Sequence, residues 1–182
     1  MKFQNKINRS LLSIVMILLT SLALGQTPEQ KALIEDVKNA KAALVQTDPG
    51  ITKLFASAEG YVIFPNVGKG AYVVGGAAGN GVLYENGHLA GLAKLRQVDI
   101  GLQIGGQAFR QVIFFKSEAA LNRFKGGNFE LAGNASAVVL EQGKAASIEF
   151  RNDVAVVTMP KAGAMVEISV GGQKFEYEDL KE

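Results

Sequence analysis

Glycine clusters between Glu59 and Leu83, and this cluster constrains the fold more than any other feature of the sequence. An apolar run from Tyr61 to Phe64 leads into a predicted turn at Pro65 and Asn66, and a second run extends from Ala71 to Val74. Glycines stand around and after that second run, at positions 68, 70, 75, 76, 79 and 81. Glycine in a strand costs backbone entropy and packs no side chain, so such a cluster is typical of bulges, bends and close approach. The stretch therefore predicts two strands that another backbone or a ligand approaches closely.

The spacing of these glycines excludes two phosphate-binding loops. A Walker loop has a glycine five positions before its Gly-Lys pair and Ser or Thr after it, whereas Ile63 precedes Gly68-Lys69 and Gly70 follows it. A dinucleotide-binding loop lies between a strand and a helix. Here the segments on both sides, Ala71–Val74 and Val82–Tyr84, are both typical of strands.

Strand patterns dominate from Tyr61 onward. Runs of apolar residues separated by turn residues predict strands over 61–64, 71–77, 81–85, 88–95, 98–104, 108–115, 136–141, 146–150, 154–159, 165–170 and 173–177. Asn86-Gly87 predicts a two-residue hairpin turn, because both positions accept positive φ. Closely spaced strands without alternating helices indicate an antiparallel sheet curled into a barrel or a sandwich.

Helices are predicted at three places, two before the strands and one among them. Thr27-Pro28-Glu29-Gln30 forms a capping box and begins a helix that extends to about Gln46. Its apolar stripe consists of Leu33, Val37, Ala40 and Leu44. Asp48 caps a short second helix over residues 49–57, and Ser117 caps a short helix near residues 117–125. The fold class is therefore α+β, a β-rich single domain over residues 26–182 with two N-terminal helices.

The first predicted helix carries lysines beside its apolar stripe, at Lys31, Lys38 and Lys41. Lysine stems lie along apolar surface while their ammonium groups reach phosphate, which is the geometry of a helix at a membrane interface. The alternative is an ordinary solvated flank. Glu35 and Asp36 favour that alternative, because they dilute the positive charge.

A secretory signal peptide is predicted over residues 1–25. Lys2, Lys6 and Arg9 precede an apolar run from Leu11 to Leu24, and small residues allow cleavage after Gly25. A retained membrane anchor is the alternative, but the run is shorter than the ~20 apolar residues of a spanning helix. We therefore expect an exported protein of the periplasm or outer envelope.

Removal of this segment changes the charge balance. Three of the 19 basic residues lie in it and none of the 17 acidic ones do, which leaves 16 against 17. A nearly neutral domain lacks the positive field that nucleic acid binding requires, so nucleic acid is not an expected partner. The chain has no cysteine, so neither a disulfide framework nor a lipid-anchoring cysteine is available.

Catalytic patterns are absent from the sequence. The single histidine, His88, follows the predicted hairpin turn, and no Gly-x-Ser-x-Gly motif supplies a serine nucleophile. One histidine without cysteine cannot build a typical zinc site, and no calcium loop is present. The carboxylates are scattered, without a signal for a glycosidase-like pair. We expect a protein that is not an enzyme and needs no cofactor.

Binding residues are better represented. Basic side chains follow strand ends and glycine turns along the chain, at Lys53, Lys69, Lys94, Arg96, Arg110, Lys116, Arg123, Lys125, Arg151, Lys161 and Lys174. For any single one, an ordinary solvated charge is the alternative. Glycine N–H groups beside a lysine form an anion-holding nest, and Gly68-Lys69-Gly70 has this composition.

An ordered series of motifs resembles the SYLF lipid-binding domain, a family related to the Ysc84-type actin- and phosphoinositide-binding domain. The motifs are Gly60, Ile63-Phe64-Pro65, Val67, Gly68-Lys69-Gly70, Gly75-Gly76 and Gly79-Asn80-Gly81-Val82-Leu83. The resemblance continues at 99–107, 117–124, 161–163 and 171–175, and covers roughly residues 30 to 178. Lys69 lies where the family has its Lys-x-Gly.

The resemblance implies lipid binding without catalysis. Eukaryotic relatives bind phosphoinositide membranes through the domain and an N-terminal amphipathic segment, and some bind actin. In an exported protein neither phosphoinositide nor actin is expected, so the implied partner is an anionic phospholipid surface. The predicted lipid-binding residues are Lys31, Lys38, Lys41, Gly68, Lys69 and Gly70. The alternative is a soluble periplasmic module that binds a protein or a small apolar ligand.

Overall fold

A computed structural model describes residues 26–68, 76–98, 108–127, 129–131, 137–161 and 170–180. The predicted signal peptide over residues 1–25 lies outside these ranges, as do the predicted site residues Lys69 and Gly70. The chain divides into two units, residues 1–31 with Glu182 and residues 32–181. The described part of the first unit is residues 26–31, where helix α2 (Pro28–Thr47) begins.

The predicted capping box opens α2. The Thr27 N–H donates to Gln30 Oε1 at 2.9 Å, and the Gln30 N–H donates to Thr27 Oγ1 at 3.2 Å. Both N–H groups would otherwise lack partners at the helix N-terminus. Within residues 32–181, the predicted stripe is buried at Val37, Ala40 and Leu44. In the described part of the chain, none of the helices combines the length and the apolar character needed to cross a bilayer.

Asp48 ends α2 and begins the next elements, a 3₁₀ turn η1 (Pro49–Ile51) and helix α3 (Thr52–Ser57). Its carboxylate is nearly fully buried and accepts hydrogen bonds from the N–H groups of Ala145 at 2.7 Å and Gly50 at 2.9 Å. Ala145 begins a second 3₁₀ turn, η2 (Ala145–Ser147), nearly a hundred residues along the chain. Asp48 therefore caps η1 and also binds the first residue of η2.

Stability is expected to depend on the charge of Asp48. The backbone hydrogen bonds from Ala145 and then Gly50 lower the pKa of this carboxyl below its ordinary value of 3.8. A lowered folded-state pKa stabilises the protein above the unfolded-state value, and this stabilisation is lost as the pH falls through the folded-state pKa. Thermal melts between pH 6 and pH 2 should therefore show a steeper fall for the wild type than for Asp48→Asn below pH ~3.8. Parallel curves would contradict a charged Asp48 in the folded state.

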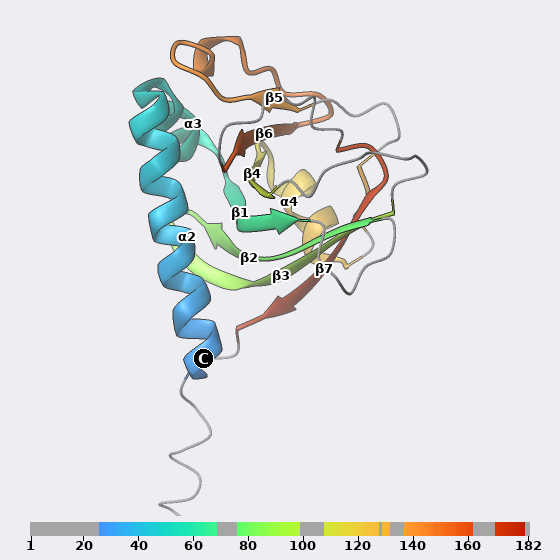
Figure 1. The fold of residues 1–182 in the computed structure, drawn as a ribbon. Coiled ribbons are helices and arrows are strands. Elements are labelled where there is room, and N and C mark those ends of the chain that lie inside the picture. Colours follow the sequence, from blue (N-terminus) through green and yellow to red (C-terminus); the bar gives the residue numbers. More distant parts are fainter. Residues whose placement is uncertain are drawn as a thin grey trace, which may run out of the picture. The chain divides into compact units, whose positions relative to one another are not determined.

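In the part of the chain that the structure describes, seven strands form one sheet in the order β5-β6-β4-β1-β2-β3-β7 (Figure 1). The strands are β1 (Gly60–Gly68), β2 (Gly76–Glu85), β3 (His88–Val98), β4 (Ala108–Phe115), β5 (Val138–Val139), β6 (Val154–Pro160) and β7 (Gln173–Asp179). All neighbours pair antiparallel except β5 and β6, which are parallel. Helix α4 (Glu118–Lys125) follows β4, where the sequence predicts it. The α+β class and the curled antiparallel sheet are confirmed.

Several predicted strand boundaries were wrong. No turn lies at Pro65-Asn66, because β1 continues through them with an irregularity in its pairing to both neighbours. The segment 81–85 is the second half of β2, and 136–141 contains only the two residues of β5. Residues 146–150 contain part of η2 and irregular backbone instead of a strand. The predicted strand at 165–170 lies outside the described residues except for Val170, as do 71–75 and 99–104.

The predicted close approach at the glycines of β2 is confirmed, and the approaching group is β1. A Cβ at Gly81 would lie 2.6 Å from Cδ1 of the Phe64 ring and 2.7 Å from the Ile63 carbonyl oxygen. A Cβ at Gly79 would lie 2.7 Å from the Asn66 carbonyl oxygen. Real side chains essentially never come this close, so glycine allows β2 to lie against the irregular part of β1.

The two faces of the sheet carry separate hydrophobic clusters. On the face we call outer, Ile63, Val112 and Phe114 pack with the buried stripe of α2. On the inner face, Phe64 and Phe115 pack with residues of α4 and β7. Figure 1 shows α2 and α4 on opposite sides of the strands.

The sheet curls around its inner face. Phe64 of β1 and Phe175 of β7 have ring centroids 5.7 Å apart, although β2 and β3 lie between their strands in the sheet. The Gln111 side chain of β4 likewise donates to Gln173 Oε1 of β7 at 2.7 Å. Gln173 Nε2 donates in turn to Gln111 Oε1 at 3.1 Å and to Gln97 Oε1 at 3.0 Å. A network of three buried glutamines thus joins three strands inside the curled sheet.

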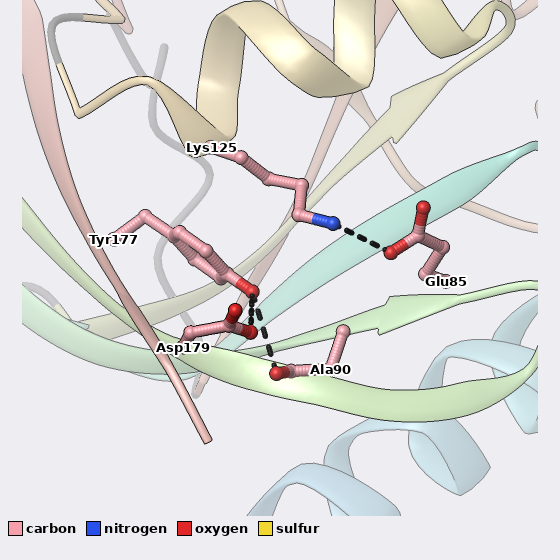
Figure 2. A network of polar contacts seen from close by, with 5 residues as sticks. All are labelled: Glu85, Ala90, Lys125, Tyr177 and Asp179. Carbon is pink, nitrogen blue, oxygen red and sulfur yellow. Dashed lines mark hydrogen bonds and ion pairs between the residues drawn. The ribbon is translucent and has the colours of Figure 1, made fainter. Parts of the chain in front are cut away.

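Polar contacts stabilise the end of the sheet where β2 and β3 are joined by a hairpin turn (Figure 2). Asn86 and Gly87 have φ of 50° and 80°, which confirms the predicted two-residue turn between β2 and β3. Lys125 at the end of α4 forms a 2.7 Å ion pair with Glu85 before the turn. Tyr177 donates to Asp179 Oδ1 at 2.8 Å and to the Ala90 carbonyl at 3.3 Å. Figure 2 shows these contacts side by side between α4, β2, β3 and β7.

Candidate binding site at the cationic end of the sheet

The opposite end of the sheet brings together strand ends that are far apart in the sequence. Gly68, the last residue of β1, pairs with Ala78 of β2 and Ala108 of β4. The Lys161 N–H, just after β6, donates to the Ala108 carbonyl at 3.0 Å. Ala78 pairs in turn with Arg96 of β3. The end of β1 therefore lies between the end of β6 on one side and the end of β3 on the other.

Basic side chains of the outer face gather at this end. Successive residues of a strand point to opposite faces, so Arg110, between the inner Phe109 and Gln111, lies on the outer face. The same alternation places Lys94 and Arg96 of β3 there, because Leu95 between them belongs to the inner cluster. Lys161 follows Pro160 and donates a hydrogen bond from Nζ to Asn66 Oδ1 on the neighbouring strand β1.

Burial and neighbouring charges act on the pKa of Lys161. Partial burial and then the positive charge of Arg110 lower the pKa of Lys161, while the carboxylate of Asp36 on α2 acts in the opposite direction. Two cations close enough to oppose each other's charge form a site where a bound anion relieves repulsion. Such a site favours an anionic group at this end of the sheet.

A pocket of about 800 Å³ opens beside these cations. Its walls come from α2, from the irregular part of β1 and from the paired ends of β2 and β3. Apolar groups of Leu33, Pro65 and Ala78 share the lining with the charged side chains Asp36, Lys94 and Arg96. A volume of ~300–1,000 Å³ is typical of small-molecule sites. The pocket is therefore large enough for a ligand and combines apolar walls with charge.

The ion pairs near this end are weak ones. Arg96 Nε lies 3.8 Å from Glu176 Oε1, and Lys174 Nζ lies 3.9 Å from Glu130 Oε2, with all four side chains more than half exposed. Exposed pairs of this length contribute little free energy. Among the described residues, Lys94 and Arg110 have no ion-pair partner within 4.0 Å. These cations remain available to an external anion.

The residues predicted from the sequence as lipid-binding occupy different settings. Lys31 is exposed near the start of α2, and Lys38 is exposed and paired with Glu35 at 3.3 Å. Lys41 is partly buried, donates to the Tyr61 hydroxyl at 2.7 Å and lies 4.5 Å from the centroid of the Phe55 ring. Gly68 is half-buried at the end of β1.

The structure adds residues that were not selected from the sequence. Lys94, Arg96, Arg110 and Lys161 stand among eleven scattered basic residues, and only the strand register brings them to one end of the sheet. The alternation of side chains along a strand could have predicted from the sequence that Lys94 and Arg96 lie on the same face. In the described ranges, no group of three or more His, Asp or Glu side chains is placed to hold a metal ion.

Comparison with known families supports the resemblance suggested by the motifs. Residues 96–179, a little under half of the chain, match the model of the Ysc84 family, which is described as Las17-binding protein actin regulator. The matched part begins near the end of β3 and includes Arg96, Arg110 and Lys161, but not the glycine-rich stretch 59–83. The resemblance to the SYLF family is confirmed over these residues. No curated protein matches the chain.

Proposed function

We propose, from this family match and from the cationic end of the sheet, that the protein binds anionic phospholipid head groups without catalysing a reaction. The observation that carries the proposal is the gathering of Lys94, Arg96, Arg110 and Lys161 on one face beside a pocket. These four cations come from β3, from β4 and from the residue after β6, so the folded sheet alone creates the local charge. A nearly neutral domain can attract an anionic surface only through such a patch.

The expected strength of this attraction is moderate. A basic residue near an anionic membrane contributes ~1 kcal/mol, and the attraction falls off within a Debye length of ~10 Å at 0.1 M salt. Four cations thus supply up to ~4 kcal/mol, from which the nearby Asp36 carboxylate subtracts. Binding should therefore be reversible and sensitive to salt.

The lysines of α2 are expected to add to head-group binding or to hold the helix in place. Lys31 and Lys38 are exposed, and the weak pair between Lys38 and Glu35 can be exchanged for a phosphate group. The ammonium group of Lys41 already lies over the rings of Phe55 and Tyr61, at 4.5 and 4.7 Å from their centroids. We assign Lys41 to holding α2 against the sheet, and Lys31 and Lys38 to head-group contact along with Gly68-Lys69-Gly70.

The family description names Las17 and actin. The proposed signal peptide would deliver the chain to the periplasm or outer envelope, where actin is not expected. A second candidate function is favoured by the apolar part of the pocket, namely a soluble module that binds a small ligand without touching a membrane. Salt distinguishes the two, because screening weakens head-group attraction and leaves apolar burial nearly unchanged.

Replacing two of the four cations should weaken membrane binding. Co-sedimentation of the purified protein with phosphatidylglycerol and phosphatidylcholine vesicles should show binding that rises with the anionic fraction and falls with salt. The double variant Arg110→Gln/Lys161→Gln should bind at least about tenfold more weakly, since each lost cation removes ~1 kcal/mol near the surface.

A matched control removes the same charge elsewhere. Lys53 on α3 and Lys144 before η2 are both exposed and lie outside the cationic end. Lys53→Gln/Lys144→Gln should therefore bind vesicles within about twofold of the wild type. Equal losses in the two double variants would mean that net charge alone acts, and no binding at any composition would refute the proposed function.

A further inference from the structure

The pocket beside the cationic end has more structure than contact with a membrane surface requires. Its volume is about 800 Å³ and it is open to solvent on one side, whereas head groups on a flat bilayer need only exposed cations. One wall is α2, which contributes Leu33 and Asp36, and the opposite wall consists of the irregular part of β1 and of paired residues of β2 and β3. A pocket of this size between a helix and a sheet can hold a part of a ligand that is transferred from water into the protein.

The apolar wall fits a hydrocarbon chain. Pro65 and Ala78 line the pocket with Leu33, and none of the three carries a side chain that can donate or accept a hydrogen bond. Burying a methylene group contributes ~0.8 kcal/mol. A long chain thus supplies affinity that head-group contact alone cannot.

The charges of the lining specify the head group. The lining contains two cations, Lys94 and Arg96, and one carboxylate, Asp36, so its formal net charge is +1. A head group with a single negative charge balances this lining, while a doubly charged phosphate monoester would also meet the repulsion of Asp36. Arg96 already holds a carboxylate loosely, because Glu176 lies 3.8 Å away and both side chains are exposed. A ligand carboxylate can take the place of Glu176 at the Arg96 guanidinium.

We propose that this pocket binds one long-chain fatty acid, with the chain against Leu33, Pro65 and Ala78 and the carboxylate at Lys94 and Arg96. This inference rests on the proposed function, because it names the lipid class that the same end of the sheet holds. It differs from surface binding in one respect: the ligand is a single molecule taken into the protein. Binding of monomeric fatty acid therefore does not require a bilayer.

Displacement of a fluorescent fatty acid tests the inference on the purified protein. Dansylundecanoic acid should bind saturably at one site below its micelle concentration, and palmitate should displace it. Octanoate should compete far more weakly, because fewer methylene groups are buried. Ala78→Phe, which fills the pocket, should weaken binding at least about tenfold. Failure of the dansyl probe to bind the wild type would overturn the inference.

The head-group contact has its own variant and matched control. Lys94→Gln should weaken palmitate binding about two- to fivefold, as expected for an exposed charge pair. Lys144→Gln removes an exposed lysine before η2, outside both the cationic end and the pocket lining, and should leave binding unchanged. Stronger binding of lysophosphatidic acid than of palmitate would overturn the assignment of a singly charged head group.

Parallel vesicle co-sedimentation separates the two proposals. Ala78→Phe should lose palmitate and keep salt-sensitive vesicle binding, whereas Arg110→Gln/Lys161→Gln should lose most vesicle binding. Palmitate binding without vesicle binding would refute the proposed function alone. Vesicle binding without palmitate binding would refute the fatty-acid site alone. Circular dichroism melts of each variant confirm that both measurements concern folded protein.

Discussion

Replacing Phe124 with alanine is expected to lower the free energy of unfolding by about 3–5 kcal/mol. Phe124 is fully buried where α4 lies on the inner face of the sheet. Its ring centroid lies 5.1 Å from that of Phe115, 5.5 Å from that of Phe129 and 5.7 Å from that of Phe175. Truncation removes contacts to three segments at once and leaves a cavity that the curled sheet can close only partly. Urea denaturation followed by circular dichroism measures the loss.

Phe150 provides the comparison within the same protein. It is half-buried after η2, at the margin of the outer cluster, so Phe150→Ala should cost clearly less than Phe124→Ala. Phe124→Leu should cost less than Phe124→Ala as well, because it retains part of the apolar volume. A loss below about 1 kcal/mol for Phe124→Ala would contradict the placement of α4 as the filling of the inner face.

Local signals predicted the helices well. The Thr27 and Gln30 side chains make the two predicted hydrogen bonds, and Ser117 accepts from the Ala120 N–H at 3.3 Å as a cap should. Asn86-Gly87 adopts the predicted positive φ values. These motifs span no more than four residues, so their physics is complete within the sequence itself.

Long-range pairing overrode local signals elsewhere. Pro65 and Asn66 have turn chemistry, but β1 pairs on both sides with β2 and β4, and an irregularity absorbs the proline within the strand. Residues 146–150 alternate as a strand would, yet the buried carboxylate of Asp48 holds the Ala145 N–H and favours a 3₁₀ turn there. In both places the decisive partner lies far away in the sequence.

The same reason explains which part of the candidate site was predictable. The motif resemblance predicted the family and the region around Gly68, because those motifs are local. Arg110 and Lys161 come close together only through the register of β4 with β6. Arg96 is placed at the same end of the sheet by the pairing of β2 with β3. A single sequence does not contain this register, so these cations could be named only as members of a scattered set.

Replacing Gln173 with leucine is expected to destabilise the protein by about 3 kcal/mol. Gln173 and Gln111 are fully buried and exchange two hydrogen bonds, at 2.7 and 3.1 Å, across the interior of the curled sheet. Leucine has a similar size, so little cavity forms. The cost arises because the Gln111 amide loses both of these partners in the interior, and each unsatisfied buried group costs ~1–3 kcal/mol. Gln46→Leu, at an exposed position of α2, should be nearly neutral.

The double variant Gln111→Leu/Gln173→Leu distinguishes a polar cost from a packing cost. If the loss in Gln173→Leu comes from stranding the Gln111 amide, removing that amide as well should restore part of the stability. The double variant should then be more stable than the sum of the single losses predicts, with a coupling energy of about 1–3 kcal/mol. Urea denaturation of the four proteins completes the cycle. Strictly additive losses would show that the two amides contribute independently, and that the hydrogen bonds between β4 and β7 do not hold the curled sheet together.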